Sequence, residues 1–281
     1  MPVAVVTGAG SGLGREIALR LAVRQYRVFG TAVEQAEIDD LAVSSNGAVT
    51  LKICDITRED QLRDLAAFVA AESGGGVNLL VNNAGTLTPG PLEIIPLDAV
   101  RREFEVNTFA FVATVNAFLP ALRKAMGKIL QISTTSVDFP SPFNSLSSAS
   151  KAAAEAFATA YRAELYQAGI EVIVAVPGNM RTGGPARTRA ALERVCAAMT
   201  DEQRLHYGVA FGKFADRINA GQHAGTEAAT AAAAIVALVA ATPSLRRAPI
   251  GDDAREILDY VATAAGEAQD IRRLKSIGIE I

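Results

Sequence analysis

The stretch Thr7-Gly8-Ala9-Gly10-Ser11-Gly12-Leu13-Gly14 decides the fold of this chain. It follows a short apolar run, residues 3–6, and precedes a segment with helical periodicity, residues 15–22. Glycines in this place let backbone amides approach a pyrophosphate at the N-terminus of a helix, where side chains would block the approach. Four glycines in register between a strand and a helix therefore predict a dinucleotide site.

The rest of the chain continues this alternation of strand and helix. Apolar runs bounded by turn residues predict five further strands, at residues 27–30, 49–53, 79–81, 128–132 and 171–176. Helical periodicity lies between them, at residues 59–71, 97–126 and 149–167. This order is typical of a parallel sheet covered by helices on both faces. We predict the α/β class, with a doubly wound, Rossmann-like sheet in a single domain over residues 1–281.

The strand pattern stops after Pro177-Gly178. Residues 181–226 contain helical pieces, at 187–199 and 202–218, and no predicted strand, which is typical of a substrate lid inserted beyond the sheet. The Ala-rich run 228–241 is shorter than the roughly 20 residues that cross a bilayer, so it predicts a helix packed on the sheet or on another subunit. Residues 252–281 have the mixed character of a surface helix.

Composition favours a small-molecule substrate. The chain has 281 residues, with 27 Lys and Arg against 30 Asp and Glu, and no basic run, which argues against nucleic acid or a membrane as partner. The first residues enter a strand-like run without the pattern of a secretory signal, so we expect a cytoplasmic protein. Neither Cys54 and Cys196 nor His206 and His223 have metal-ligand spacing, so we expect reduced, buried thiols and no metal.

These features resemble the short-chain dehydrogenase/reductase superfamily over residues 3–182. The resemblance rests on the glycine loop, on Asp55, on Asn82-Asn83-Ala84-Gly85, on Asn107 and on Pro177-Gly178-Asn179-Met180-Arg181-Thr182. It implies NAD or NADP as cofactor, and a homodimer or homotetramer formed through the central helices, residues 97–126 and 149–167. The cofactor-binding residues that it implies are Gly8, Ser11, Gly12, Leu13, Gly14, Glu34, Asp55, Ile56, Asn83, Ala84, Gly85, Lys151, Pro177, Gly178 and Thr182.

Several of these residues also have a purely structural interpretation. Asn82 and Asn83 are suited to satisfy backbone groups at strand ends, and Asn107 is consistent with a kink in a helix. Asp55 is equally suited to be the N-cap of a helix that begins near Arg58.

The end of the second predicted strand carries neither usual selectivity signature. In the family that this chain resembles, an acid near Ala32 selects NAD, and an arginine at Val33 or in place of Ser11 pairs with the 2′-phosphate of NADP. Glu34 stands where it can repel a phosphate or accept from a ribose hydroxyl, which predicts a slight preference for NAD. A solvated loop carboxylate is the alternative for Glu34.

The catalytic motif is incomplete. The family pairs a serine with Tyr-x-x-x-Lys, and alignment on Lys151 places Ser147 at the tyrosine position and Thr134 at the serine position. Threonine keeps a hydroxyl donor, but a serine hydroxyl is a far weaker acid than a phenol with a pKa of about 10. Lys151 follows Ser147 by one helical turn and is predicted to hold the nicotinamide ribose, with a solvated surface lysine as the alternative.

We therefore predict a catalytic set of Asn107, Thr134, Ser147 and Lys151, with protons moved through water or by a lid residue. His206 and Tyr207 are the lid candidates, and an aromatic patch that packs the lid is their alternative. Four phenylalanines are suited either to line an apolar pocket or to anchor the lid: Phe139, Phe143, Phe211 and Phe214.

Three functions are consistent with this sequence. The first is an atypical nicotinamide-dependent oxidoreductase that acts on a hydroxyl or carbonyl group of an apolar or cyclic small molecule. The second is a non-redox enzyme, such as a cyclase, isomerase or lyase, that keeps the cofactor pocket. The third is a non-catalytic nucleotide-binding subunit. Cofactor titration discriminates among them, because only the third class tolerates an absence of binding.

Overall fold

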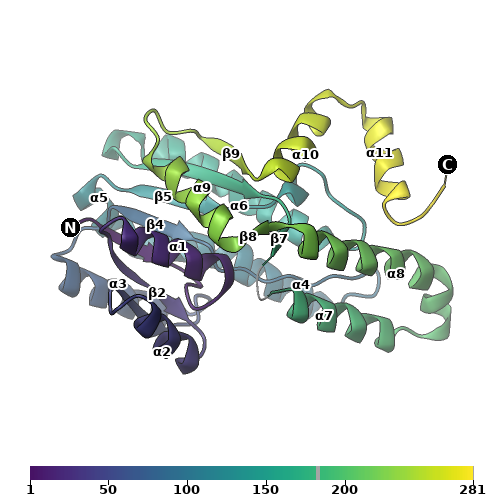
Figure 1. Cartoon of the computed structure of the whole chain (residues 1–281), viewed down its shortest axis with the longest axis horizontal. Coiled ribbons are helices and arrows are strands. Elements are labelled where there is room, and N and C mark those ends of the chain that lie inside the picture. Colours follow the sequence, from purple (N-terminus) through teal and green to yellow (C-terminus); the bar gives the residue numbers. More distant parts are fainter. Residues whose placement is uncertain (182–183, 281) are drawn as a thin grey trace.

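The computed structural model of the chain describes residues 1–181 and 184–280, and a parallel sheet lies at its centre (Figure 1). The sheet has seven strands in the order β3-β2-β1-β4-β5-β6-β9, and every neighbouring pair is parallel. Its strands are β1 (Val3–Val6), β2 (Arg27–Ala32), β3 (Val49–Ile53), β4 (Leu79–Asn82), β5 (Lys128–Ile132), β6 (Glu171–Pro177) and β9 (Arg247–Ile250). The order reverses between β1 and β4, where the carboxyl ends of the strands form a crevice in folds of this class.

Helices cover both faces of the sheet, which is why its central strands are apolar without interruption. Along β1, Ala4 and Val6 pack toward α1 (Gly12–Val23), α2 (Gln35–Ser44) and α9 (Ala228–Ala240). Val3 and Val5 alternate with them and pack toward α3 (Glu59–Ser73), α5 (Ala110–Ala125) and α6 (Ser145–Glu164). These two cores confirm the predicted α/β fold.

The structure corrects several predicted elements. Helix α2 was not predicted, and neither was strand β9. Strand β9 contains Pro249, and β6 is its one neighbour among the described strands. The helix predicted at 97–126 is divided into α4 (Leu97–Phe104), a π-helical turn (Glu105–Phe109) and α5. The predicted 149–167 helix, α6, already begins at Ser145. The tail forms two helices, α10 (Asp252–Thr263) and α11 (Gly266–Lys275), rather than one.

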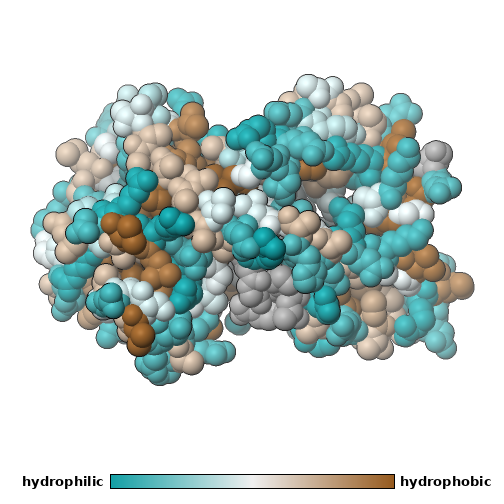
Figure 2. Space-filling view, in the orientation of Figure 1, coloured by the Kyte–Doolittle hydropathy of each residue, from teal (hydrophilic) through white to brown (hydrophobic). Residues whose placement is uncertain are grey.

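The predicted lid is a pair of long helices, α7 (Gly184–Ala198) and α8 (Asp201–Ala224), that extends beyond the sheet in Figure 1. Short strands β7 (Met180–Arg181) and β8 (Thr226–Glu227) pair with each other where this segment leaves and returns, so the expectation of no strand was wrong at its ends. A capping box begins α8, since Thr200 Oγ1 accepts from the Gln203 amide at 3.2 Å. In Figure 2 the visible face is mainly hydrophilic over α8 and α10, with hydrophobic patches over α1 and α2.

Candidate active site

The glycine loop forms a cradle at the N-terminus of α1. Gly8 has a φ of +63°, a conformation that favours glycine, and its amide donates to Thr31 Oγ1 at 2.8 Å. A β-carbon on Gly14 would lie 2.2 Å from the Gly8 carbonyl oxygen and 2.4 Å from Asn83 Nδ2, so only glycine fits there. Ser11 is the N-cap of α1, and Gly12 and Leu13 begin its first turn. The backbone amides of this turn therefore face the place where an anionic group would bind.

The Asn83 side chain holds the cradle to the neighbouring strand. Its Nδ2 donates to the carbonyl oxygens of Thr7 at 3.0 Å and Gly8 at 3.3 Å. Thr7 Oγ1 accepts in return from the amides of Asn83 at 3.0 Å and Ala84 at 3.1 Å. The structural interpretation of Asn83 is thus confirmed, and it places Ala84 beside the glycine loop. Asn82 differs, because its buried Nδ2 has no hydrogen-bond partner among residues 1–181 and 184–280.

The carboxylate that lies against the glycine loop is Glu37, which the sequence analysis missed. A β-carbon on Gly10 would lie 2.4 Å from Glu37 Oε2, and the same oxygen accepts from the Val33 amide at 3.2 Å. Glu34 is the exposed N-cap residue of α2, and its side chain forms no cap hydrogen bond. Glu37 follows Glu34 by three residues, and residues three apart at the start of a helix share a face. This spacing was the signal in the sequence that could have pointed to Glu37.

Asp55 stabilises a turn after β3. Its carboxylate accepts from Thr57 Oγ1 at 2.7 Å and from the Thr57 amide at 3.0 Å, and these bonds lower the pKa of Asp55. Helix α3 has Arg58 as its N-cap, so the alternative that Asp55 caps this helix is wrong. Ile56 follows in the same half-buried turn.

The predicted segment after β6 is described only in part. Pro177 is the last residue of β6, and the Gly178 amide donates to the Ile250 carbonyl at 3.3 Å. A β-carbon on Gly178 would lie 2.3 Å from both carboxylate oxygens of Asp253, which explains glycine at this position. Thr182 lies outside the described residues.

Asn107 lies in the π-helical turn between α4 and α5. Its Nδ2 donates to the Thr86 carbonyl and to Ser150 Oγ, both at 3.0 Å, and its Oδ1 accepts from the Thr86 amide at 2.9 Å. Asn107 is therefore both the residue of an irregular helical turn and a fixed point between the loop after β4 and helix α6. π-Helical turns of this kind are frequent at functional sites.

Lys151 is buried next to Asn107, so the alternative of a solvated surface lysine is wrong. Its Nζ donates to the Ile132 carbonyl at 3.0 Å. Burial lowers the pKa of Lys151 to about 8, while the negative charges of Glu103 and Glu155 act in the opposite direction. A β-carbon on Gly85 would lie 3.1 Å from Asn107 Oδ1 and 3.3 Å from Lys151 Nζ. The structure thus brings three predicted site residues together at one point.

A buried carboxylate, Glu103, completes this cluster and was not predicted. Glu103 is 0% exposed, and its Oε2 accepts from the Thr88 amide at 2.7 Å. Its Oε1 lies 3.5 Å from Asn107 Nδ2. Burial raises the pKa of Glu103 to about 7, although hydrogen bonds from the side chain and the amide of Thr88, and the Lys151 charge, oppose that rise. The spacing of four residues from Asn107 on a helix was the signal that pointed to it.

Thr134 lies just after the end of β5, and Ser147 lies in the first turn of α6. Thr134 is the N-cap of a short 3-10 turn (Thr135–Val137), and its Oγ1 accepts from the Ser136 amide at 3.2 Å. Asn144, the N-cap residue of α6, donates to Ser136 Oγ at 3.0 Å and so links the two segments. Ser147 is half-buried one turn before Lys151. The described contacts include no hydrogen bond from the Ser147 hydroxyl.

The lid candidates are held by structural contacts. The Tyr207 hydroxyl donates to Glu93, and this bond raises the pKa of Tyr207, the wrong direction for an acid that works near neutrality. Its ring packs edge-on against Phe143, with 6.4 Å between ring centroids, and His206 is exposed. These contacts support the packing interpretation of the pair.

The four phenylalanines also make packing contacts. Phe211 and Phe214 are fully buried, and Phe143 packs against them at 5.4 and 5.6 Å between ring centroids. Phe139 instead meets Tyr260 of α10 at 6.0 Å. Three of the four therefore anchor the lid to the start of α6, and the fourth anchors the C-terminal helices.

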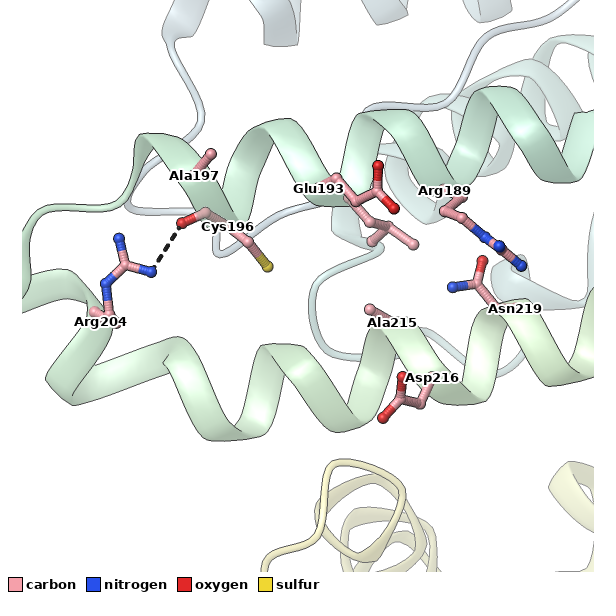
Figure 3. A pocket seen from close by; sticks show the side chains of 9 residues that line it. Arg189, Glu193, Cys196, Ala197, Arg204, Ala215, Asp216 and Asn219 are labelled. Carbon is pink, nitrogen blue, oxygen red and sulfur yellow. Dashed lines mark hydrogen bonds between the residues drawn. The ribbon is translucent and has the colours of Figure 1, made fainter.

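The lid itself contains a cavity of about 700 Å³ between α7 and α8 (Figure 3). Arg204 closes one end by donating to the Cys196 carbonyl at 3.2 Å. None of the predicted catalytic residues lines this cavity. Cys196 is half-buried rather than buried, whereas Cys54 is buried as expected, and burial raises the pKa of its thiol to about 11.

Several known proteins are similar to this chain. The family model described as short chain dehydrogenase matches residues 2–193. The uncharacterized oxidoreductase YusZ of Bacillus subtilis is 37% identical over 190 residues, which cover 64% of this chain and 65% of that protein. Mitochondrial D-beta-hydroxybutyrate dehydrogenase of Rattus norvegicus is 27% identical over 88% of this chain and 76% of its own length.

A solved structure shares nearly the whole fold. The short chain dehydrogenase of Burkholderia cenocepacia, solved in complex with NADP, is 26% identical and superimposes with a TM-score of 0.74 over 97% of each chain. The aligned segment covers just under two thirds of the length of YusZ. The family model covers more than half of the chain, including the glycine loop, Asn107 and Lys151. The chain belongs to the short chain dehydrogenase family.

Proposed function

We propose that this protein is a nicotinamide dinucleotide-dependent oxidoreductase that acts on a hydroxyl or carbonyl group of an apolar or cyclic small molecule. The observation that carries the proposal is the meeting of Gly85, Asn107 and Lys151 beside the glycine cradle. The names of the relatives, an oxidoreductase and a hydroxybutyrate dehydrogenase, support this class of reaction.

The residues of the cradle fit a dinucleotide. The close approach of Gly14 to Gly8 and Asn83 leaves no room for a side chain at position 14, and the backbone amides of the first turn of α1 are left to bind a pyrophosphate. Asp55, Ala84 and Lys151 would contact the rest of the cofactor. When bound, the nicotinamide supplies hydride transfer to or from the substrate carbon.

A preference for NAD over NADP is part of this proposal. The Glu37 carboxylate beside Gly10 disfavours a phosphate on the adenine ribose, and it supports the preference more directly than Glu34 does. Arg15 has no free guanidinium for that phosphate, because it pairs with Asp40 at 2.8 Å and Glu16 at 3.2 Å. The Burkholderia relative binds NADP, so cofactor choice is a property to measure here rather than to transfer.

Proton transfer without a phenol requires another path. We propose that a water held among Thr134, Ser147 and Lys151 carries the proton, since the hydroxyl of Ser147 makes no hydrogen bond to the described residues that would occupy it. Tyr207 is less suited to this task, because its hydroxyl is bonded to Glu93.

Two further features belong to the proposal. Phe143, two residues before α6, packs against Phe211 but is itself only half-buried, which supports an apolar substrate beside it. Phe109 and Phe157 are exposed by 53% and 41% on the central helices, which supports a homodimer or homotetramer formed there.

The test uses the purified protein with NAD or NADP and a panel of apolar secondary alcohols, and it follows the absorbance of the reduced nicotinamide. We expect turnover that Lys151→Met reduces at least a hundredfold, whereas Lys124→Met, on the surface, leaves it unchanged. Cofactor binding without hydride transfer on any alcohol or ketone would favour the non-redox enzyme. Turnover that is insensitive to Lys151→Met would overturn the assignment of the site.

A further inference from the structure

We infer that Glu103 is a positioning residue of this site: its carboxylate is buried against Asn107 and, as a negative charge beside Lys151, keeps the proton on the Lys151 ammonium. The inference rests on the proposed function, because that proposal makes Asn107 and Lys151 site residues. It adds a residue that acts through them and does not itself touch the substrate or cofactor.

The position of Glu103 follows from the helix that carries it. Glu103 lies at the end of α4, one turn before Asn107, and it is the residue of α4 that is completely buried. The π-helical turn that follows keeps Asn107 Nδ2 3.5 Å from Glu103 Oε1. The Thr88 amide fixes the other carboxylate oxygen at 2.7 Å. Both oxygens are therefore directed by neighbours, and one of those neighbours is a predicted catalytic residue.

A buried glutamate at position 103 lowers the free energy of unfolding unless its charge interacts favourably with another group. An isolated carboxylate with no exposure to water is strongly disfavoured, and an apolar side chain would pack the same volume more cheaply. In the part of the chain that the structure describes, its hydrogen-bond partners are the amide and the side chain of Thr88, with a long contact to Asn107 Nδ2. Lys151 is the charged group that acts on it. No direct ion pair joins the two side chains in that part of the chain, so they interact through space.

Glu103 and Lys151 both lie close to Asn107: Glu103 Oε1 is 3.5 Å from Asn107 Nδ2, and a β-carbon on Gly85 would lie 3.1 Å from Asn107 Oδ1 and 3.3 Å from Lys151 Nζ. Burial favours the neutral form of Lys151, and two carboxylates oppose that effect, Glu103 first and Glu155 second. The Glu155 carboxylate also accepts from Arg247 at 2.8 Å and from Ser133, so its charge is already shared. The Glu103 charge has no arginine or lysine in contact with it among the described residues. Glu103 is thus the group best placed to hold Lys151 protonated near neutral pH.

The two pKa values define the pH range in which Glu103 and Lys151 are both charged. The pKa of Glu103 is about 7 and that of Lys151 is about 8, so both groups are charged between these values. Above about pH 8 Lys151 loses its proton. Removing the negative charge of Glu103 takes away an effect that raises the pKa of Lys151, so Lys151 must lose its proton at a lower pH in the variant.

The test compares Glu103→Gln with Glu105→Gln, since Glu105 is an exposed carboxylate two residues away. Glutamine has nearly the same shape and keeps an oxygen for the Thr88 amide. Infrared spectra of the cofactor-free protein follow the protonated carboxyl band of Glu103, and ¹⁵N-lysine NMR follows the Lys151 ammonium signal. We expect a carboxyl band that titrates near pH 7 and is missing only in Glu103→Gln. In that variant the Lys151 titration should move down by about one pH unit.

Two results would overturn the inference: a Lys151 titration that is the same in Glu103→Gln and the natural protein, or an equal shift in Glu105→Gln. If Glu103→Gln does not fold, Lys151→Met supplies the reciprocal test, because linkage requires that loss of the Lys151 charge raise the titration of Glu103 by a matching amount. Neither measurement needs cofactor or substrate. A protein that fails to oxidise any alcohol can therefore still confirm or overturn the role of Glu103.

Discussion

Restoring the missing phenol is the most informative perturbation of this protein. Ser147 is half-buried, one helical turn before Lys151, and its hydroxyl makes no hydrogen bond to the described residues. Ser147→Tyr would place a phenol, with an unperturbed pKa of about 10, near the buried Lys151 ammonium. A positive charge at close range lowers such a pKa by about 1 to 3 units, into the range that a general acid needs.

The expected gain follows from the usual contribution of general acid catalysis. A well-placed acid is worth about 10² to 10⁴ in rate, which is roughly 3 to 5 kcal/mol of activation free energy. Ser147→Ala removes one of the three groups that we propose hold the relay water and leaves Thr134 and Lys151, so we expect a change within about 0.5 kcal/mol, or about twofold. Comparison of these two variants separates the chemistry of the phenol from the loss of the serine.

The assay is reduction of an apolar ketone, followed by the loss of absorbance of the reduced nicotinamide between pH 6 and pH 9. Ser147→Phe is the matched control, because it adds the same ring without the hydroxyl. Rates for Ser147→Tyr and Ser147→Phe that both equal that of the natural protein would refute the placement of Ser147 at the reacting group. A loss of activity in both ring variants would show that the space before Ser147 belongs to the substrate or to a relay water.

Three other expectations follow. Gly14→Ala should weaken NADH binding by about 5- to 150-fold in calorimetry, since its β-carbon meets the backbone at 2.2 Å and overpacking costs about 1 to 3 kcal/mol. Gly212→Ala, with open space around it, should leave the affinity unchanged, and equal affinities of the two variants would contradict the assignment of the glycine loop as the cofactor cradle. Glu37→Gln should tighten NADPH binding relative to NADH by up to about tenfold, and Glu34→Gln should change the ratio less; the reverse order would return the selectivity to Glu34. Phe157→Glu should reduce the oligomer to a smaller species in size-exclusion chromatography, and an unchanged mass would place the interface elsewhere.

The local sequence pattern predicted most of the strands of the sheet but not all of them. The six predicted strands are all present because each is rich in apolar residues and is bounded by turn residues, and strands of a parallel sheet covered on both faces are rich in such residues. Strand β9 lacks this pattern, with Arg247 and Pro249 in four residues, and only its pairing with β6 makes it a strand. The helix kink considered at Asn107 is present as a π-helical turn, whose exact form the ordinary helical periodicity of its neighbours did not reveal.

The sequence by itself determined the cradle, since glycine spacing between a strand and a helix is local and only the absence of side chains gives that loop its shape. It also placed Asn107 and Lys151 in the site and showed that position 147 carries no phenol. The tertiary structure decided which charges surround them. Glu103 became a buried partner of Lys151 because α4 packs on α6, and Tyr207 was bonded to Glu93, 114 residues away in the chain. Burial and charge proximity depend on contacts between distant segments, which the order of residues does not state.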